Sequence, residues 1–267
     1  MDYLTPILFF AGIGVAAGVI LTVAAKLFAV EGNVIVKKLT EQLPGTNCGA
    51  CGFANCSKYA EAIAAEKVAP NQCKPGGVAV AEKIGEVLGK SVNAAEPETA
   101  FVFCNGKPPN SPDSSAIDEK YRYNGGQSCR ACELYYNGKN SCRFGCTGLG
   151  DCVAICPENA ISLVNSIAVV DSRRCTACGL CIKACPKNII RVQSTGQRVN
   201  VACSSKDFGA KVKSVCVTGC IGCKICIKKC PQSAIQMRDN LAEINAELCD
   251  NCGICASSCP MKSIVKS

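Results

Sequence analysis

The chain has 267 residues, a formal net charge of +8 and an apolar fraction of 48% that includes 25 cysteines. Aromatic residues make up only 5%, and neither tryptophan nor histidine occurs. Apart from its cysteines the chain is poor in the side chains of an ordinary hydrophobic core, so metal or disulfides must hold it together. The absence of histidine excludes Cys/His zinc fingers, Rieske-type sites and haem ligation by histidine.

The cysteine spacing favours metal over disulfides. The count is odd, and nearly all cysteines fall in Cys-x-x-Cys and Cys-x-x-x-Cys groups, whereas disulfide frameworks are typical of small secreted domains. The positive charge does not indicate a nucleic-acid partner, because each oxidised four-iron cluster with its thiolates carries about −2. Six such clusters would bring the net charge to about −4.

The N-terminal segment predicts a membrane anchor. Residues 3–25 carry no charge and would extend about 34 Å as a helix. This length is enough to cross the hydrocarbon core of a membrane, where the helix would contact lipid. A cleaved signal peptide would begin with basic residues and have a shorter apolar run. Positive charges follow the segment, at Lys26, Lys37 and Lys38. We therefore expect a single pass through the cytoplasmic (inner) membrane, with residues 26–267 on the cytoplasmic side.

Changes in composition divide the remaining chain. Two helix-like stretches, 57–68 and 78–88, accompany the first four cysteines, and residues 105–118 have the Pro/Ser/Asn content of a linker. The predicted fold class is α+β, small and cluster-stabilised. Its parts are a transmembrane anchor (1–30), a small helical four-cysteine [4Fe-4S] domain (31–100), a linker and connector (101–140), and two bacterial-ferredoxin-like modules (141–200 and 201–267).

The two modules are predicted from an internal repeat. Cys156-Pro157 precedes a Cys-x-x-Cys-x-x-Cys-x-x-x-Cys-Pro run that begins at Cys175, and Cys230-Pro231 precedes a second run at Cys249 by the same spacing. Short β-like runs follow three of the Cys-Pro pairs, at residues 160–163, 189–192 and 234–237. This pattern is typical of two copies of one strand-and-turn design.

In the bacterial ferredoxin run, three cysteines bind one [4Fe-4S] cluster and the fourth binds the neighbouring cluster. Two-residue gaps let three thiolates converge, and the proline ends the local helix. Zinc seldom needs the third Cys-x-x-Cys step, since two pairs already complete its tetrahedron. The rule predicts three ligand sets: Cys220, Cys223, Cys226 and Cys259; Cys249, Cys252, Cys255 and Cys230; Cys175, Cys178, Cys181 and Cys156.

The remaining cysteines are less regular. In the first module we expect a widened set, Cys142, Cys146, Cys152 and Cys185. The N-terminal domain supplies a fifth set, for which four-thiolate zinc is the alternative: Cys48, Cys51, Cys56 and Cys73. A sixth cluster would use Cys104, Cys129, Cys203 and Cys216, with Cys132 spare; alternatively these are buried free thiols. None of these cysteines is expected to act as a catalytic acid, base or nucleophile.

Several segments resemble a known family. Over essentially its whole length, the chain resembles the B-subunit family of the Rnf complex. The resemblance rests on an apolar N-terminal anchor followed by the segments LPGTNCGACGFANC, SCRFGCTGLGDCVAICP, CSSKD and VCVTGCIGCKICIKKCP. The resemblance implies a subunit of an ion-translocating ferredoxin:NAD oxidoreductase that moves sodium ions or protons. Such a subunit would accept electrons from reduced ferredoxin and relay them through [4Fe-4S] clusters to the membrane subunits and ultimately to NAD.

The chain fits such a division of labour, because it lacks both the dinucleotide-binding and the phosphate-loop motifs. NAD chemistry would therefore belong to partner subunits. Basic residues in the last module would either dock an acidic ferredoxin or form a solvated face: Lys224, Lys228 and Lys229. Alternative functions are the iron–sulfur electron-input subunit of another membrane oxidoreductase, such as a hydrogenase-like complex, and a structural zinc-binding protein.

Overall fold

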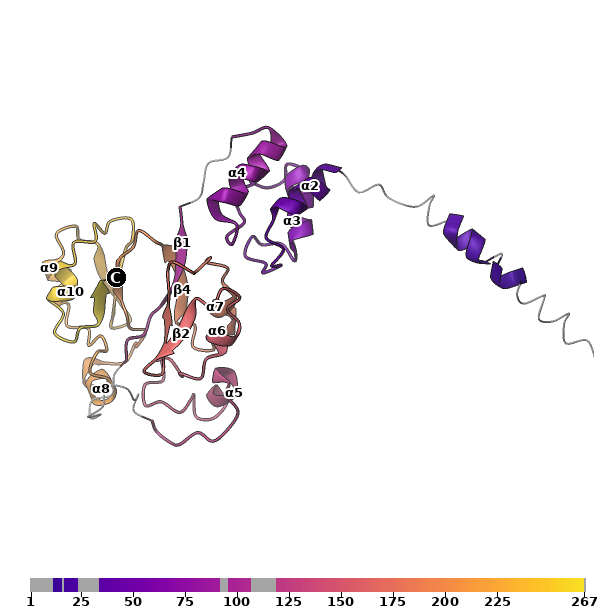
Figure 1. Ribbon diagram of the computed structural model, residues 1–267. Helices are drawn as coiled ribbons and strands as arrows, with labels where there is room; N and C mark the ends of the chain where they lie inside the picture. The colour runs from indigo at the N-terminus through magenta and orange to yellow at the C-terminus, as the bar shows by residue number, and fades with distance from the viewer. Residues whose placement is uncertain (1–11, 16, 24–33, 92–95, 107–118, 267) are drawn as a thin grey trace, which may run out of the picture.

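The computed structural model describes residues 12–15, 17–23, 34–91, 96–106 and 119–266 (Figure 1). Much of the predicted membrane segment lies outside these ranges. Residues 12–15 and 17–23 are helical, and their apolar side chains, including Val19, Ile20 and Leu21, are exposed. Within the described ranges, no helix combines the length and the apolar character that a membrane crossing requires.

The four-cysteine domain consists of three helices, α2 (Val34–Gln42), α3 (Cys56–Ala64) and α4 (Gly77–Leu88). The last two confirm the helical stretches predicted from the sequence. A small core of Leu39, Tyr59 and Ile84 lies between the helices. The N-terminus of α3 is capped by Asn55, whose side-chain oxygen accepts the Lys58 N–H at 2.8 Å. The chain is therefore held in place where Cys56 begins the helix.

The Tyr59 hydroxyl forms hydrogen bonds that hold the loop leading to Cys73. Its hydroxyl donates to the Ala69 carbonyl at 3.0 Å and accepts the Gln72 N–H at 2.9 Å. Burial raises the pKa of the Tyr59 hydroxyl to about 12.

Replacing Tyr59 with phenylalanine should destabilise this domain by about 1 kcal/mol, because the partly buried Gln72 N–H and the Ala69 carbonyl lose their partner. Native-state hydrogen exchange at the Gln72 amide measures the change. Tyr135→Phe is the control, since Tyr135 is 59% exposed, and it should have little effect. Unaltered exchange at Gln72 in Tyr59→Phe would contradict this role.

The first ferredoxin-like module combines a hairpin with a second strand pair. Strands β2 (Ile161–Val164) and β3 (Ile167–Val170) form the hairpin, while β1 (Glu98–Val102) pairs antiparallel with β4 (Ile190–Ser194). Its helices are short: α5 (Cys129–Glu133), α6 (Asp151–Ala154) and α7 (Leu180–Ala184). Because β1 pairs with β4, residues 98–102 lie on the first module, whereas the sequence assigned residues 98–100 to the four-cysteine domain and residues 101–102 to the linker and connector.

The second module repeats this design. The hairpin is β6 (Ile235–Arg238) with β7 (Leu241–Ile244), and β5 (Val199–Val201) pairs antiparallel with β8 (Ile264–Lys266). Its helices are α8 (Gly209–Val215), α9 (Ile225–Lys229) and α10 (Ile254–Ser257). Strands β2, β4 and β6 lie at the three predicted β-like runs. The fold therefore has small domains of mixed helix and strand content, as the sequence indicated.

All four Cys-Pro pairs end in the same turn. The second residue after each proline is left-handed, with φ between 47° and 52°, at Asn159, Asn188, Ser233 and Lys262. Its N–H donates to the carbonyl of the cysteine before the proline. The turn reverses the chain directly after a candidate ligand and starts the next strand, which explains why thiols and strands alternate in both modules.

Candidate iron–sulfur sites

The second module brings one predicted set of thiols around a single cavity. Cys220, Cys223 and Cys226 approach it from the start of α9, and Cys259 from the last Cys-Pro turn. Burial, together with the other thiolates, raises the pKa of Cys226 to about 11. Such thiols stay protonated alone, whereas binding to iron removes their protons.

Three further predicted sets also gather. Burial raises the pKa of Cys181 to about 11, and the thiolates of Cys175, Cys178 and Cys156 add to this effect. Burial likewise raises the pKa of Cys255, beside Cys249, Cys230 and Cys252. In the four-cysteine domain, burial raises the pKa of Cys73, to which Cys56, Cys51 and Cys48 contribute. These groupings agree with the ligand sets expected from spacing.

The irregular half of the first module is grouped differently from our expectation. One cavity is lined by Cys129, Cys146, Cys152 and Cys185. Cys142, expected in this set, lies instead on a second cavity with Cys104, Cys203 and Cys216. Cys129 therefore takes the position in this set that the sequence assigned to Cys142, and Cys142 takes the position that the sequence assigned to Cys129.

Asp151 is the physical reason for the exchange. Its carboxylate accepts the Cys129 N–H at 2.8 Å and the Arg130 N–H at 3.1 Å, and the Ser128 hydroxyl at 3.1 Å. Asp151 is also the first residue of α6, directly before Cys152. The carboxylate therefore fixes the start of α5 beside α6 and places Cys129 next to Cys152.

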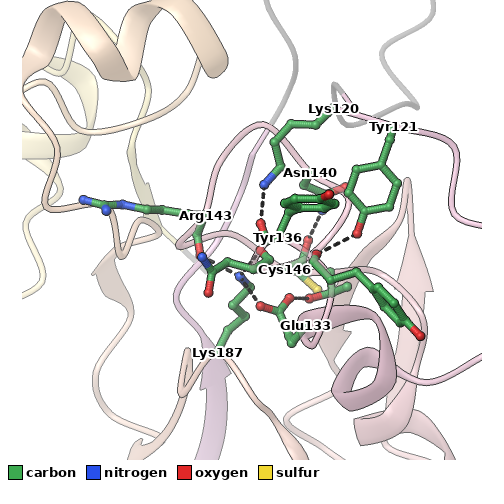
Figure 2. Close-up of polar contacts among 11 residues, drawn as sticks. Lys120, Tyr121, Glu133, Tyr136, Asn140, Arg143, Cys146 and Lys187 are labelled. Carbon is green, nitrogen blue, oxygen red and sulfur yellow. Dashed lines mark hydrogen bonds and ion pairs between the residues drawn. The ribbon is translucent and has the colours of Figure 1, made fainter.

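A buried ion pair holds the segments that carry these thiols (Figure 2). Lys187 Nζ lies 2.6 Å from Glu133 Oε2, and their side chains are only 9% and 16% exposed. Lys187 also donates to the carbonyls of Asn137, at 2.9 Å, and Arg143, at 2.7 Å. Glu133 accepts the Thr147 hydroxyl at 2.8 Å. The pair thus joins α5, the 142–147 loop and the turn after Cys185.

Backbone N–H groups donate to several of the sulfur atoms. Ala100 and Ala177 donate to Cys175 Sγ at 3.3 and 3.4 Å, and Ala160 donates to Cys156 Sγ at 3.3 Å. Such bonds favour the charged thiolate over the thiol, and around bound clusters they adjust the reduction potential.

No group of three or more Cys, His, Asp or Glu side chains in the described ranges converges as a single metal ion requires. One zinc ion would draw four sulfurs to within about 4 Å of one another. A four-iron cluster binds each thiolate at a separate iron, so the four sulfurs surround a larger volume. Cys132 is fully buried and lines none of the cysteine-lined cavities described above.

Comparisons with known families match the same segments. Residues 43–75 match a family described as an Fe-S cluster family, and residues 141–189 and 219–264 each match a 4Fe-4S dicluster domain. Cys104, Cys129, Cys203 and Cys216 lie outside all three matches. These matches support [4Fe-4S] clusters as the cofactors of the chain.

Similar proteins cover nearly the whole chain. The Methanosarcina acetivorans B-subunit of an ion-translocating oxidoreductase complex is 40% identical over 95% of this chain and 94% of its own length. The chain belongs to the B-subunit family of ion-translocating oxidoreductase (Rnf) complexes. Another relative is the Clostridium ljungdahlii B-subunit of a proton-translocating ferredoxin:NAD(+) oxidoreductase complex, 41% identical over 90% of this chain and 83% of that protein.

A third relative shows the breadth of the Rnf family. In Acetobacterium woodii the complex is named Na(+)-translocating ferredoxin:NAD(+) oxidoreductase, and its B-subunit is 34% identical over 98% of this chain and 77% of its own length. The resemblance noted in the sequence is thus confirmed. It extends through residues 190–218, between the two dicluster matches, which include Cys203 and Cys216.

Proposed function

We propose that the chain is the iron–sulfur electron-transfer subunit of an ion-translocating ferredoxin:NAD oxidoreductase complex. Reduced ferredoxin would supply the electrons, and [4Fe-4S] clusters would relay them towards the other subunits and ultimately NAD. The observation that carries the proposal is the gathering of cysteine thiols into sets of four in both modules and the four-cysteine domain. In such sets, bound clusters carry electrons, while the chain positions them and excludes water.

The proposed ligand sets follow the observed groupings. Four are those expected from the sequence, and the fifth consists of Cys129, Cys146, Cys152 and Cys185. The four-cysteine domain adjoins the first module, because Cys73 and Cys175 line one hollow and Lys74 Nζ lies 2.7 Å from Glu98 Oε2. These contacts support electron transfer between the cluster of that domain and the first module.

We also propose that residues 3–25 anchor the chain in the cytoplasmic membrane, with residues 26–267 on the cytoplasmic side. Support comes from the uncharged run and the lysines that follow it. The exposed apolar side chains of residues 12–15 and 17–23 are also suited to lipid.

The second module is the proposed docking site for ferredoxin. Cys223 and Cys252 are exposed, unlike the other cysteines of the described ranges. Lys224 follows Cys223 directly, and Lys228 and Lys229 lie nearby on α9, all three exposed. Electron transfer between proteins requires a cluster near the surface, and positive charge around it would attract an acidic partner.

Reversing these charges in the full-length chain, as K224E/K228E/K229E, should slow cluster reduction by reduced ferredoxin about tenfold at low salt. Stopped-flow absorbance measures the rate, and electron paramagnetic resonance identifies the reduced clusters. The difference from wild type should shrink as ionic strength rises, because salt screens exposed charges.

The control K83E/K211E/K213E makes the same charge change at exposed lysines of α4 and α8. Equal slowing in both triple variants would show that the rate depends on the net charge of the chain, and it would contradict docking at α9. A wild-type chain whose clusters are not reduced by ferredoxin at all would contradict the proposed function.

A further inference from the structure

The four Cys-Pro turns share one further backbone position, the third residue after each proline. In every turn the carbonyl of this residue accepts the N–H of the residue that directly follows the partner strand, at 2.7 to 2.8 Å. In every turn the residue is also 3% exposed or less. The backbone setting is therefore the same four times, at Ala160, Ile189, Ala234 and Ser263.

Ser263 differs from the other three residues by its hydroxyl group. The apolar side chains of Ala160, Ile189 and Ala234 show that the turn itself needs no polar group at this position. Ser263 is only 1% exposed, and within the described part of the chain its hydroxyl has no hydrogen-bond partner. Buried hydroxyls in folded proteins are almost always paired, so a hydroxyl without a protein partner points to a bound group.

The location of Ser263 identifies the bound group. Ser263 lines the same cavity as the ligand set Cys220, Cys223, Cys226 and Cys259. Apart from the thiols, the only other polar side chain on this lining is Lys224, which is exposed. A cluster bound by the four thiols is thus the group that the buried hydroxyl of Ser263 would meet.

The first module provides a natural comparison. Its equivalent residue, Ile189, lines the cavity of the ligand set Cys129, Cys146, Cys152 and Cys185. The backbone around the two positions is alike, since the Ile189 carbonyl accepts the Phe103 N–H at 2.7 Å and the Ser263 carbonyl accepts the Ala202 N–H at 2.8 Å. The two sites therefore differ at this position by a hydroxyl group in place of a hydrocarbon side chain.

A hydroxyl at such a site affects the reduction potential in a defined direction. Reduction adds one negative charge to a [4Fe-4S] cluster, and this charge is shared by its sulfides and thiolates. A hydrogen bond donated to one of these sulfur atoms stabilises the reduced state more than the oxidised state, so the reduction potential rises. The effect is strong in a buried site, because water does not compete for the sulfur. The side chain of Ile189 has no hydrogen to donate.

We propose that the Ser263 hydroxyl donates a hydrogen bond to the cluster of Cys220, Cys223, Cys226 and Cys259 and raises its reduction potential. This inference rests on the proposed electron-transfer function and deepens it. Ser263 is not an iron ligand, and its hydroxyl keeps its proton when one electron passes from reduced ferredoxin to the cluster.

The same cluster lies beside the proposed docking face. Its ligand Cys223 is exposed and directly precedes Lys224. A higher potential at this site favours the transfer of an electron from ferredoxin to the chain and disfavours its return. The hydroxyl therefore lies at the cluster where electrons would enter, and the hydrocarbon side chain of Ile189 lies at the equivalent cluster of the first module.

A redox titration of the anaerobically purified full-length chain, followed by electron paramagnetic resonance, tests the inference. In Ser263→Ala the equilibrium constant for reducing one cluster should fall about tenfold, which lowers its midpoint potential by about 59 mV for one electron. The midpoints of the other clusters should not change. Ser263→Thr keeps a hydroxyl and should stay close to wild type, since Ile189 shows that a β-branched residue fits this backbone position.

The equivalent position of the first module allows the reciprocal test. Threonine and valine have nearly the same shape and differ by a hydroxyl in place of a methyl group. Ile189→Thr should therefore raise the potential of the cluster of its own module relative to Ile189→Val. Equal midpoints in these two variants would contradict a hydrogen bond from this backbone position to a cluster.

Ser257→Ala is the control in the second module. Its hydroxyl is exposed and donates to the Ile254 carbonyl at 3.0 Å, so its removal should shift no midpoint. Unchanged midpoints in Ser263→Ala, with the iron content of wild type, would overturn this inference and leave the proposed function intact. A loss of about four iron from Ser263→Ala would show that the hydroxyl retains the cluster without setting its potential, which would also overturn it. Wild type without any reducible cluster would refute the proposed function itself.

Discussion

Removing the clusters should unfold both ferredoxin-like modules. Candidate ligand thiols form part of each core: Cys146, Cys152 and Cys181 in the first module, and Cys203, Cys226 and Cys255 in the second. Without iron, these buried thiols leave cavities where clusters would pack, and few aliphatic side chains remain. In small metal-dependent domains the free energy of metal binding, about 10–16 kcal/mol for structural zinc, is largely the free energy of folding.

Oxidative removal of iron in the presence of a chelator, followed by hydrogen exchange, measures this effect. The amides of β4 and β8 should lose essentially all protection. Helices α3 and α4 should keep part of theirs, because Leu39, Tyr59 and Ile84 form a core that does not consist of thiols. Persistent protection of β4 and β8 in the iron-free chain would show that the strand pairs fold without clusters.

The module architecture was predictable because its determinants are local. Each Cys-x-x-Cys step, each Cys-Pro turn and each following β-like run lies within a few residues of the next, and the repeat shows the pattern twice. The same local pattern gives the same turn each time. The second residue after each proline adopts the left-handed conformation, at Asn159, Asn188, Ser233 and Lys262. Four of the observed thiol groupings could be derived from spacing alone for the same reason.

The position of Cys129 could not be derived in this way. Its place depends on Asp151, which lies far along the chain and binds the start of α5 through two N–H groups and a hydroxyl. Likewise, Cys142 reaches Cys203 and Cys216 only through the packing of one module on the other. Contacts between distant segments leave no spacing pattern. Ser128 directly before Cys129 was the one local signal, since serine often caps a helix.

The pairing of residues 98–102 with the first module could not be predicted for a similar reason. The segment 98–102 is a short apolar stretch next to the predicted linker, and nothing near it in the sequence identifies β4 as its partner. Pairing with β4 places Cys104 close to the 142–146 loop, because Cys104 directly follows the strand. The strand pairing that the sequence did not reveal therefore also positions the Cys104 thiol, which the sequence left open as either a candidate ligand or a free thiol.

Lys187→Met should produce a second large effect. The side chains of Lys187 and Glu133 are only 9% and 16% exposed (Figure 2). The substitution removes the positive charge of Lys187, so the carboxylate of Glu133 loses its ion-pair partner. Breaking a buried pair in this way typically costs about 3–5 kcal/mol. The local unfolding of α5 should become easier by that amount, so its amides should exchange at least about a hundredfold faster.

Two variants separate this effect from a general loss of lysine contacts. Lys120→Met removes an exposed lysine that donates to the Tyr136 carbonyl at 2.8 Å in the same region, and it should change exchange little. In Lys187→Met/Glu133→Gln no buried charge remains, and the glutamine oxygen can still accept the Thr147 hydroxyl. This double variant should recover part of the protection lost in Lys187→Met, because the cost of the single variant is mainly the uncompensated carboxylate. Without such recovery, the role of Lys187 would lie in its bonds to the carbonyls of Asn137 and Arg143.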